Sequence, residues 1–252
     1  MKTESLLQYL HGYLALEGHP DYSVALNGLQ VEGPPEVARI VAAVDASEAS
    51  IEAAVELGAD LMIVHHGLFW DGLRPLTGRR FRRVQRLISG GTALYACHLP
   101  LDSHAEVGNC AQLGRALGLT LKERFGDYKG QPIGWWGTPS EPISAKDLQG
   151  AAQDALGGPV RLIEGGPDRL DRIGVVTGGG ASFLEEASEL GLDALVTGEG
   201  AHHSYFDAVE FGVHLLLGGH YATETFGVRA LAAHIEERFG IPWDFVDQPT
   251  GL

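Results

Sequence analysis

The stretch that decides the fold runs from Arg39 to Gly67 and reads RIVAAVDASEASIEAAVELGADLMIVHHG. Two short apolar segments, IVAAV and LMIV, flank a segment whose apolar residues recur at helical spacing and which ends at Gly58. A strand, an amphipathic helix and a second strand form the βαβ unit of an α/β protein, and similar alternation along the chain predicts an α/β fold. The second strand ends in His65 and His66, which is an unusual pair for a hydrophobic core.

The same unit occurs again about 133 positions later. RIGVVTGGGASFLEEASELGLDALVTGEG, from Arg172, aligns with the first stretch without gaps and shares its Glu-Leu-Gly run and its last glycine. Farther on, GGTALYACHLPLD from Gly90 aligns with GVHLLLGGHYATE from Gly212, and within the first of these we interpret ALYACHLPLD as a strand. We therefore expect two duplicated α/β halves related by a pseudo-twofold axis, residues 1–120 and 121–252, although no low-complexity linker marks the boundary.

Composition narrows the class of protein. A net charge of −15 argues against nucleic acid or an anionic membrane as a bulk partner, and it suits a protein that concentrates divalent cations. Apolar runs are too short for a membrane span and the N-terminus lacks the pattern of a signal peptide, so we expect a cytoplasmic protein. Cys97 and Cys110 are too few for a disulfide framework, and Cys97 lies in an apolar strand pattern typical of a core thiol.

The histidine pair and the repeat together predict a metal site. At the carboxyl end of a strand, His65 and His66 can both point into the crevice where open α/β sheets bind ligands. The repeat aligns His98 and Asp102 with His220 and Glu224, so a histidine followed four residues later by a carboxylate occurs twice. The candidate ligands are His65, His66, Asp102, His220 and Glu224. Five ligands exceed the three that a mononuclear catalytic zinc takes, which favours two divalent cations about 3.5 to 4 Å apart.

The motifs LNGLQVEG, GADLMIVHHG, HLPLDSHAEVGN, TGGG, DALVTGE and GGHYATE, in this order, resemble the YbgI-type, or Nif-three-like, dinuclear-metal proteins. These proteins are also labelled GTP cyclohydrolase I type 2 homologues. The resemblance covers about residue 23 to the C-terminus and implies two intertwined α/β halves with mixed sheets. It also implies a toroidal homohexamer, a trimer of dimers, with a dinuclear site facing its cavity. The resemblance implies metal ligation by the same five residues. His98 matches a family histidine close to the metals, and as a candidate ligand it ranks below those five.

One further carboxylate is a candidate catalytic group. The repeat aligns Glu199 with His66, which places Glu199 near the site without making it an obvious ligand. We therefore expect Glu199 to be the general base that accepts a proton from a water molecule.

Other motifs have an ordinary structural interpretation beside a functional one. TGGG, residues 177–180, follows a strand and precedes a helix, so its amides could bind a phosphate, but it lacks a Walker lysine and a tight turn explains it as well. His202 and His203 fit a solvated rim position better than a substrate contact. Trp135 and Trp136 fit packing at a sheet edge or a subunit contact better than stacking on a base.

The leading functional interpretation is a metal-dependent hydrolase that acts on an unidentified small molecule. The family label suggests nucleotides, with opening of a GTP ring as the reaction. The alternative is a non-catalytic metal-binding or scaffold protein. Imidazole and carboxylate ligands without thiolate suit Zn, Mn, Fe, Co or Ni and do not choose among them. Nucleic acid passing through a ring is disfavoured by the charge, unless RRFRR at residues 79–83 makes the cavity basic.

Overall fold

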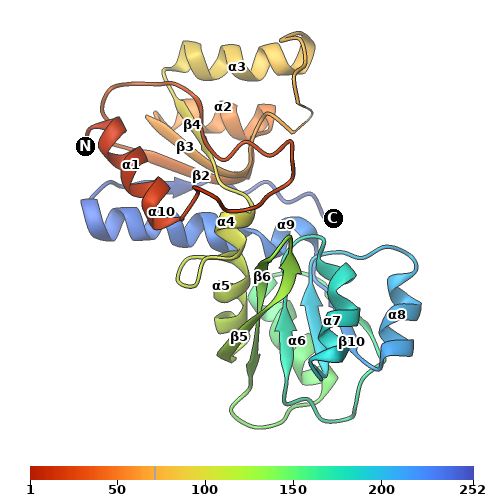
Figure 1. Cartoon of the computed structure of the whole chain (residues 1–252). Helices are drawn as coiled ribbons and strands as arrows, with labels where there is room; N and C mark the ends of the chain where they lie inside the picture. Colours follow the sequence, from red (N-terminus) through yellow and green to blue (C-terminus); the bar gives the residue numbers. More distant parts are fainter. Residues whose placement is uncertain (71) are drawn as a thin grey trace. The chain divides into compact units, whose positions relative to one another are not determined.

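A computed structural model describes residues 1–70 and 72–252, and the chain divides into two compact units (Figure 1). Unit 1 comprises residues 1–101 and 227–248, and unit 2 comprises residues 102–226 and 249–252. The segment that follows the second copy of the repeat therefore returns to unit 1. Among the described residues, no helix is long and apolar enough to cross a membrane.

Unit 1 is built on a five-stranded mixed sheet of order β1-β4-β3-β2-β11, in which β1 is antiparallel and the other four strands are parallel. Figure 1 shows α2 and α3 on one face of this sheet. The strands are β1 Gly28–Val31, β2 Ile40–Asp45, β3 Leu61–His66, β4 Ala93–Ala96 and β11 Trp243–Phe245; the helices are α1 Thr3–Tyr13, α2 Glu48–Glu56, α3 Gly78–Gly90, α4 Leu99–Asp102 and α10 Thr225–Phe239.

The core of unit 1 explains why its central strands are apolar along their whole length. Alternate residues of β2 and β3, such as Val41 and Met62, pack with Ile51 of α2 and Leu87 of α3. The intervening residues are buried as well, as expected for parallel strands that are covered on both faces. A capping box at Ser47 starts α2 immediately after β2.

Unit 2 is built on a six-stranded mixed sheet of order β5-β6-β8-β9-β10-β7, in which β8, β9 and β10 are parallel. Helices α5 and α6 pack on one face of its parallel strands through Leu113 and Leu148. The strands are β5 Thr120–Tyr128, β6 Gln131–Thr138, β7 Arg161–Ile163, β8 Ile173–Val175, β9 Ala194–Thr197 and β10 His214–Leu217; the helices are α5 Asn109–Ala116, α6 Ala145–Leu156, η1 Gly180–Phe183, α7 Leu184–Glu189, α8 Ser204–Phe211 and α9 His220–Thr223.

The internal repeat is present in the structure. The order β2-α2-β3-α3-β4-α4 in the first copy corresponds to β8-α7-β9-α8-β10-α9 in the second. The correspondence extends to single hydrogen bonds, because Asp60 Oδ2 accepts from the amide of Arg39 at 3.0 Å and Asp193 Oδ2 accepts from the amide of Arg172 at 2.8 Å. The expected α/β fold with duplicated halves and mixed sheets is therefore confirmed.

One predicted element is wrong. ALYACHLPLD was interpreted as one strand, but β4 stops at Ala96 and Leu99–Asp102 is the helical turn α4. The corresponding helical turn in the second copy is α9. In the first copy His98 precedes the turn and Asp102 ends it, whereas in the second copy His220 begins the turn and Glu224 directly follows it.

Candidate metal-binding groups

The first group of metal donors lies in unit 1 and consists of His65, His66 and His98, here called the histidine cluster. His65 and His66 are the last two residues of β3, and His98 follows β4, the parallel neighbour of β3. Because parallel strands end at the same edge of a sheet, the three rings come together there. Their donor nitrogens all lie within 4.8 Å of one another. His65 is fully buried and His98 is 8% exposed, so the cluster is largely screened from solvent.

Each ring of the histidine cluster is held through Nδ1 by an oxygen acceptor. The pairs are His65 with the carbonyl oxygen of Cys97 at 3.0 Å, His66 with Asp45 Oδ1 at 3.0 Å, and His98 with Asp21 Oδ1 at 2.8 Å. An Nδ1–H that donates to oxygen leaves Nε2 as the basic nitrogen of a neutral ring. Fixing the tautomer and orientation in this way is typical of histidine metal ligands.

Asp21 belongs to the segment before β1 and is itself held firmly. Its second oxygen, Oδ2, accepts hydrogen bonds from Asn27 Nδ2 at 2.8 Å and from the amide of Leu99 at 3.2 Å. Burial works to raise the pKa of Asp21, but the hydrogen bond and charge of His98, helped by Asn27, outweigh it and lower the pKa overall. Asp21 is therefore a negatively charged carboxylate that fixes the ring of His98.

Two aromatic side chains of unit 1 border the histidine cluster. The ring centroid of Trp70 lies 4.7 Å from that of His98 and 5.7 Å from that of His66, in both cases edge to face. Tyr22 lies 5.5 Å from His98 and is 51% exposed. The cluster therefore has an aromatic border that is partly open to solvent.

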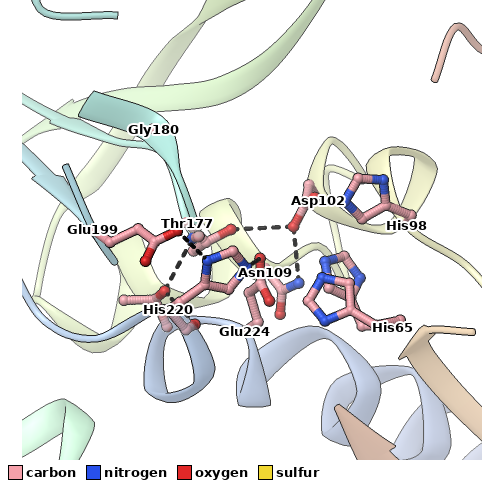
Figure 2. A network of polar contacts seen from close by, with 12 residues as sticks. His65, His98, Asp102, Asn109, Thr177, Gly180, Glu199, His220 and Glu224 are labelled. Carbon is pink, nitrogen blue, oxygen red and sulfur yellow. Dashed lines mark hydrogen bonds and ion pairs between the residues drawn. The ribbon is translucent and has the colours of Figure 1, made fainter. Parts of the chain in front are cut away.

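The second group of donors lies in unit 2 and includes His220 and Glu224. His220 begins α9 directly after Gly219, and its Nε2 lies 3.2 Å from Glu224 Oε1. On the other side of the ring, Nδ1 lies 3.0 Å from Glu199 Oε1, as Figure 2 shows. Glu224 is 3% exposed, whereas the side chain of Glu199 is 55% exposed. Glu199 therefore orients His220 in unit 2 as Asp21 orients His98 in unit 1.

The two carboxylates change the acidity of His220. The hydrogen bond to Glu224, together with the charges of Glu224 and Glu199, outweighs burial and raises the pKa of His220 to about 9. In the metal-free chain the ring is therefore a protonated imidazolium at neutral pH. A cation at Nε2 would take the place of that proton.

Asp102 completes the donors of unit 2 and is 5% exposed. Its Oδ1 accepts hydrogen bonds from Asn109 Nδ2 at 2.9 Å and Thr177 Oγ1 at 3.1 Å (Figure 2). Burial, and after it the charge of Asp102, raises the pKa of the neighbouring Cys110 to about 12, and the charge of Glu224 adds to this effect. Cys110 is thus a neutral buried thiol, and Asp102 is a fixed carboxylate.

The TGGG motif supports these carboxylates. Gly178 has φ +64°, and a Cβ atom there would lie 2.2 Å from Glu224 Oε1. The amide of Gly178 donates to Thr223 Oγ1 and that of Gly180 donates to Thr197 Oγ1, so both amides are already hydrogen-bonded. The motif therefore acts as a tight turn that leaves room for Glu224. The amides of Gly178 and Gly180 are not free to donate to a phosphate, which weakens the phosphate interpretation.

The remaining candidates are two exposed histidines and two tryptophans of β6. Among the described residues, no group of metal donors includes His202 or His203, and both side chains are exposed. Trp136 is 9% exposed and lies under the guanidinium of Arg172, whose Cζ is 4.1 Å from the ring centroid. Trp135 lies beside it on β6, with the Arg124 guanidinium over its ring.

The sequence predictions missed the residues that hold the ligands. Asp45 could have been found, because it ends β2 just as His66 ends the adjacent strand β3. Asp21 and Asn109 carried no such signal, since one lies outside the repeat and the other is a polar residue at a helix start. Together the two groups supply imidazole nitrogens and carboxylate oxygens without thiolate, which fits divalent cations such as Zn, Mn, Fe, Co or Ni.

Comparisons with known proteins agree over the whole chain. A protein of Deinococcus radiodurans, named GTP cyclohydrolase 1 type 2 homolog, is 46% identical over 99% of this chain and 94% of its own length. The solved structure described as protein ybgI, of unknown function, superposes with a TM-score of 0.93 at 38% identity and covers 100% of both chains. Protein TTHA1606 from Thermus thermophilus superposes with a TM-score of 0.90 at 41% identity, again over 100% of both chains.

The model of one protein family matches residues 1–250. That match agrees with the resemblance in the sequence motifs, with the duplicated α/β fold and with the two groups of metal donors. The chain therefore belongs to the Duf34/NIF3 (NGG1p interacting factor 3) family.

Proposed function

We propose that the chain holds two divalent cations through its imidazole and carboxylate donors and that it is a metal-dependent hydrolase acting on a small molecule. The observation that carries this proposal is the histidine cluster, in which an oxygen acceptor fixes each of three converging rings through Nδ1. Packing three imidazoles together at the end of a sheet, two of them buried, is a costly arrangement unless a ligand binds them.

The proposed ligands are His65, His66, Asp102, His220 and Glu224, with His98 as an additional donor of the cluster. Two bound cations would polarise a carbonyl, phosphoryl or purine ring carbon of the substrate and lower the pKa of a bound water molecule. The chain itself keeps the imidazoles in the correct tautomer and the carboxylates at fixed positions. Asn109 and Thr177 do this for Asp102, and Asp45 does it for His66.

Glu199 is the proposed general base. It holds His220 Nδ1 through one carboxylate oxygen and is more than half exposed, so its other oxygen can accept a proton from water. The same hydrogen bond gives Glu199 a positioning role, and the two roles predict different results on substitution. Loss of a base lowers the rate alone, whereas loss of a support for His220 lowers metal affinity.

The substrate class is taken from the names of the relatives. Deinococcus radiodurans and Halobacterium salinarum both have a protein named GTP cyclohydrolase 1 type 2 homolog, at 46% and 49% identity. We propose nucleotides as the first substrates to test and a homohexamer, built as a trimer of dimers, as the assembly. A metal-binding scaffold without catalysis is the alternative, and it predicts full metal content with no hydrolysis.

The test combines elemental analysis with a hydrolysis screen over nucleotides, phosphoesters and amides. Wild-type chain should hold two cations and hydrolyse at least one class of substrate. Glu199→Gln should keep both cations and lose about 10² to 10⁴ of the rate. The matched control is Glu189→Gln, an exposed glutamate at the end of α7, which should change neither quantity.

Three results would contradict the proposal. One cation or none per chain would remove the dinuclear site. Full metal content with no hydrolysis in the screen would support the scaffold instead. A Glu199→Gln chain that loses metal but retains its rate per bound metal would make Glu199 a support for His220 and not a base.

A further inference from the structure

A strongly basic segment stands out in this acidic chain. Residues 72–101 contain six arginines and no acidic residue, whereas the chain as a whole has 18 basic residues against 33 acidic ones. Five of the six arginines lie on α3. The positive charge is therefore concentrated on one helix of unit 1, α3, which itself carries no candidate metal ligand.

Four of these arginines form one surface, here called the arginine face: Arg79, Arg82, Arg83 and Arg86. Their i, i+3, i+4 and i+7 spacing places them on a single side of α3. Figure 1 shows α3 lying along α2. All members of the arginine face except Arg79 line a surface pocket of about 220 Å³ together with Glu48 and Glu52 of α2. The pocket is also lined by Gln85 and Ser89.

Within the described part of the chain, one member of the arginine face is paired with a carboxylate. Arg82 forms a bidentate ion pair with Glu48, with Nε–Oε2 at 2.8 Å and Nη2–Oε1 at 2.7 Å. Over the described ranges 1–70 and 72–252, no carboxylate lies within ion-pair distance of Arg79, Arg83 or Arg86. The Nε atoms of Arg83 and Arg86 are moreover buried without a hydrogen-bond acceptor.

The arrangement is unfavourable for the chain alone. Burial lowers the pKa of Arg83, and the neighbouring charge of Arg79 lowers it further, against the charges of Glu48 and Asp45, which raise it. Partly buried guanidinium donors without an acceptor lower the stability of the fold, and a bound anion that accepts their hydrogen bonds restores it. Glu52 opposes an anion here, but the guanidiniums of the face still outnumber the two carboxylates.

We propose that the arginine face and its pocket bind the phosphate groups of a small phosphorylated ligand. Arginine donors arranged in parallel recognise phosphate by paired, charge-assisted hydrogen bonds, and several adjacent arginines suit a chain of phosphates better than one carboxylate. Gln85 and Ser89 supply neutral polar groups at the same pocket. The site contains none of the candidate metal ligands, so this proposal does not depend on the proposed hydrolase activity.

The test is calorimetric titration of the full chain with inorganic tripolyphosphate at constant ionic strength. Arg83→Gln and Arg86→Gln should each weaken binding about tenfold, because each removes charge-assisted hydrogen bonds. Glu52→Gln should strengthen binding, because it removes the opposing charge. Arg161→Gln is the control, since it deletes the same charge from an exposed strand position in unit 2.

All these proteins contain the same metal donors, so binding of the probe to metal is common to them and cancels in the comparison. Guanosine, which lacks phosphate, should not compete with tripolyphosphate. Equal affinity of wild type, Arg83→Gln and Arg86→Gln would overturn the proposal. So would binding of a single-stranded oligonucleotide without binding of tripolyphosphate, because the face would then serve nucleic acid.

Discussion

Replacing Gly178 by alanine tests the donors of unit 2 without touching a donor. The added Cβ would lie 2.2 Å from Glu224 Oε1, whereas ordinary contacts of a Cβ begin at 3.4 Å. The carboxylate must therefore move by roughly 1 Å, which is well beyond the tolerance of about 0.2 Å in metal–ligand distances. The same Cβ would lie 3.3 Å from His220 Nε2, so the histidine is crowded as well. We expect Gly178→Ala to lose cations that depend on Glu224.

Gly191→Ala is a closely matched control for the backbone. Gly191 also lies in unit 2 and has φ +66° against +64° for Gly178, but a Cβ there has nothing within 4 Å. Both substitutions place alanine in the left-handed region, at a cost of about 1 kcal/mol in the free energy of unfolding. Gly191→Ala should show that cost alone and keep its metal.

The two variants are compared by urea unfolding and by elemental analysis after reconstitution. Metal content near wild type in Gly191→Ala and a clear loss in Gly178→Ala would support the assignment of Glu224 and His220. Equal metal content in both variants would refute the reasoning, because a displaced carboxylate could not then be a ligand. Measuring both quantities separates loss of metal from loss of fold.

Three other predictions test the support of the ligands, their protonation and the assembly. Asp45→Ala removes the partner of His66 Nδ1 and should weaken metal binding about 10- to 100-fold in a chelator competition. The control Asp154→Ala, at an exposed position, should leave metal affinity unchanged, and equal affinities of the two variants would contradict the role of Asp45. The hydrogen bond to Glu224 raises the pKa of His220 to about 9 in the metal-free chain. Protonated His220 therefore stabilises the folded chain, fully below pH 6.5, the ordinary pKa of histidine, and this stabilisation is lost as the pH rises through 9. The urea midpoint of the metal-free wild-type chain should fall between pH 6.5 and 9, and it should fall less in His220→Gln. Identical pH profiles of the two proteins would refute this role of His220. Light scattering should give six times 26.9 kDa, and a monodisperse monomer would argue against the hexamer.

Much of the fold could be predicted because it depends on patterns that a sequence displays directly. The helix expected between the two apolar segments of the first stretch is α2, Glu48–Glu56, which ends just before the predicted stop at Gly58. The repeat predicted which elements correspond, down to Asp60 and Asp193. The sequence predicts β4 too long, because Leu99, Pro100 and Leu101 continue the apolar run although the chain has already turned into α4.

The supports of the candidate ligands could not be predicted in the same way. Asp21 meets His98 across 77 positions of sequence, from a segment without strand or helix periodicity. Thr177 meets Asp102 across 75 positions. Contacts of this kind follow from the finished fold, and only the end of a neighbouring strand, as at Asp45, gives a local signal for them.

The two copies of the repeat show which part of such a site a duplicated sequence determines. His98 and His220 occupy equivalent positions, and in both the Nδ1 atom lies against a carboxylate oxygen, at 2.8 and 3.0 Å. The carboxylates themselves are not equivalent, because Asp21 precedes the first copy while Glu199 follows β9 inside the second. A histidine that binds metal needs its other nitrogen held, and each unit meets that need from a different element. The repeat therefore predicts where the imidazoles lie, and the chemistry of imidazole, not the repeat, accounts for Glu199 beside His220.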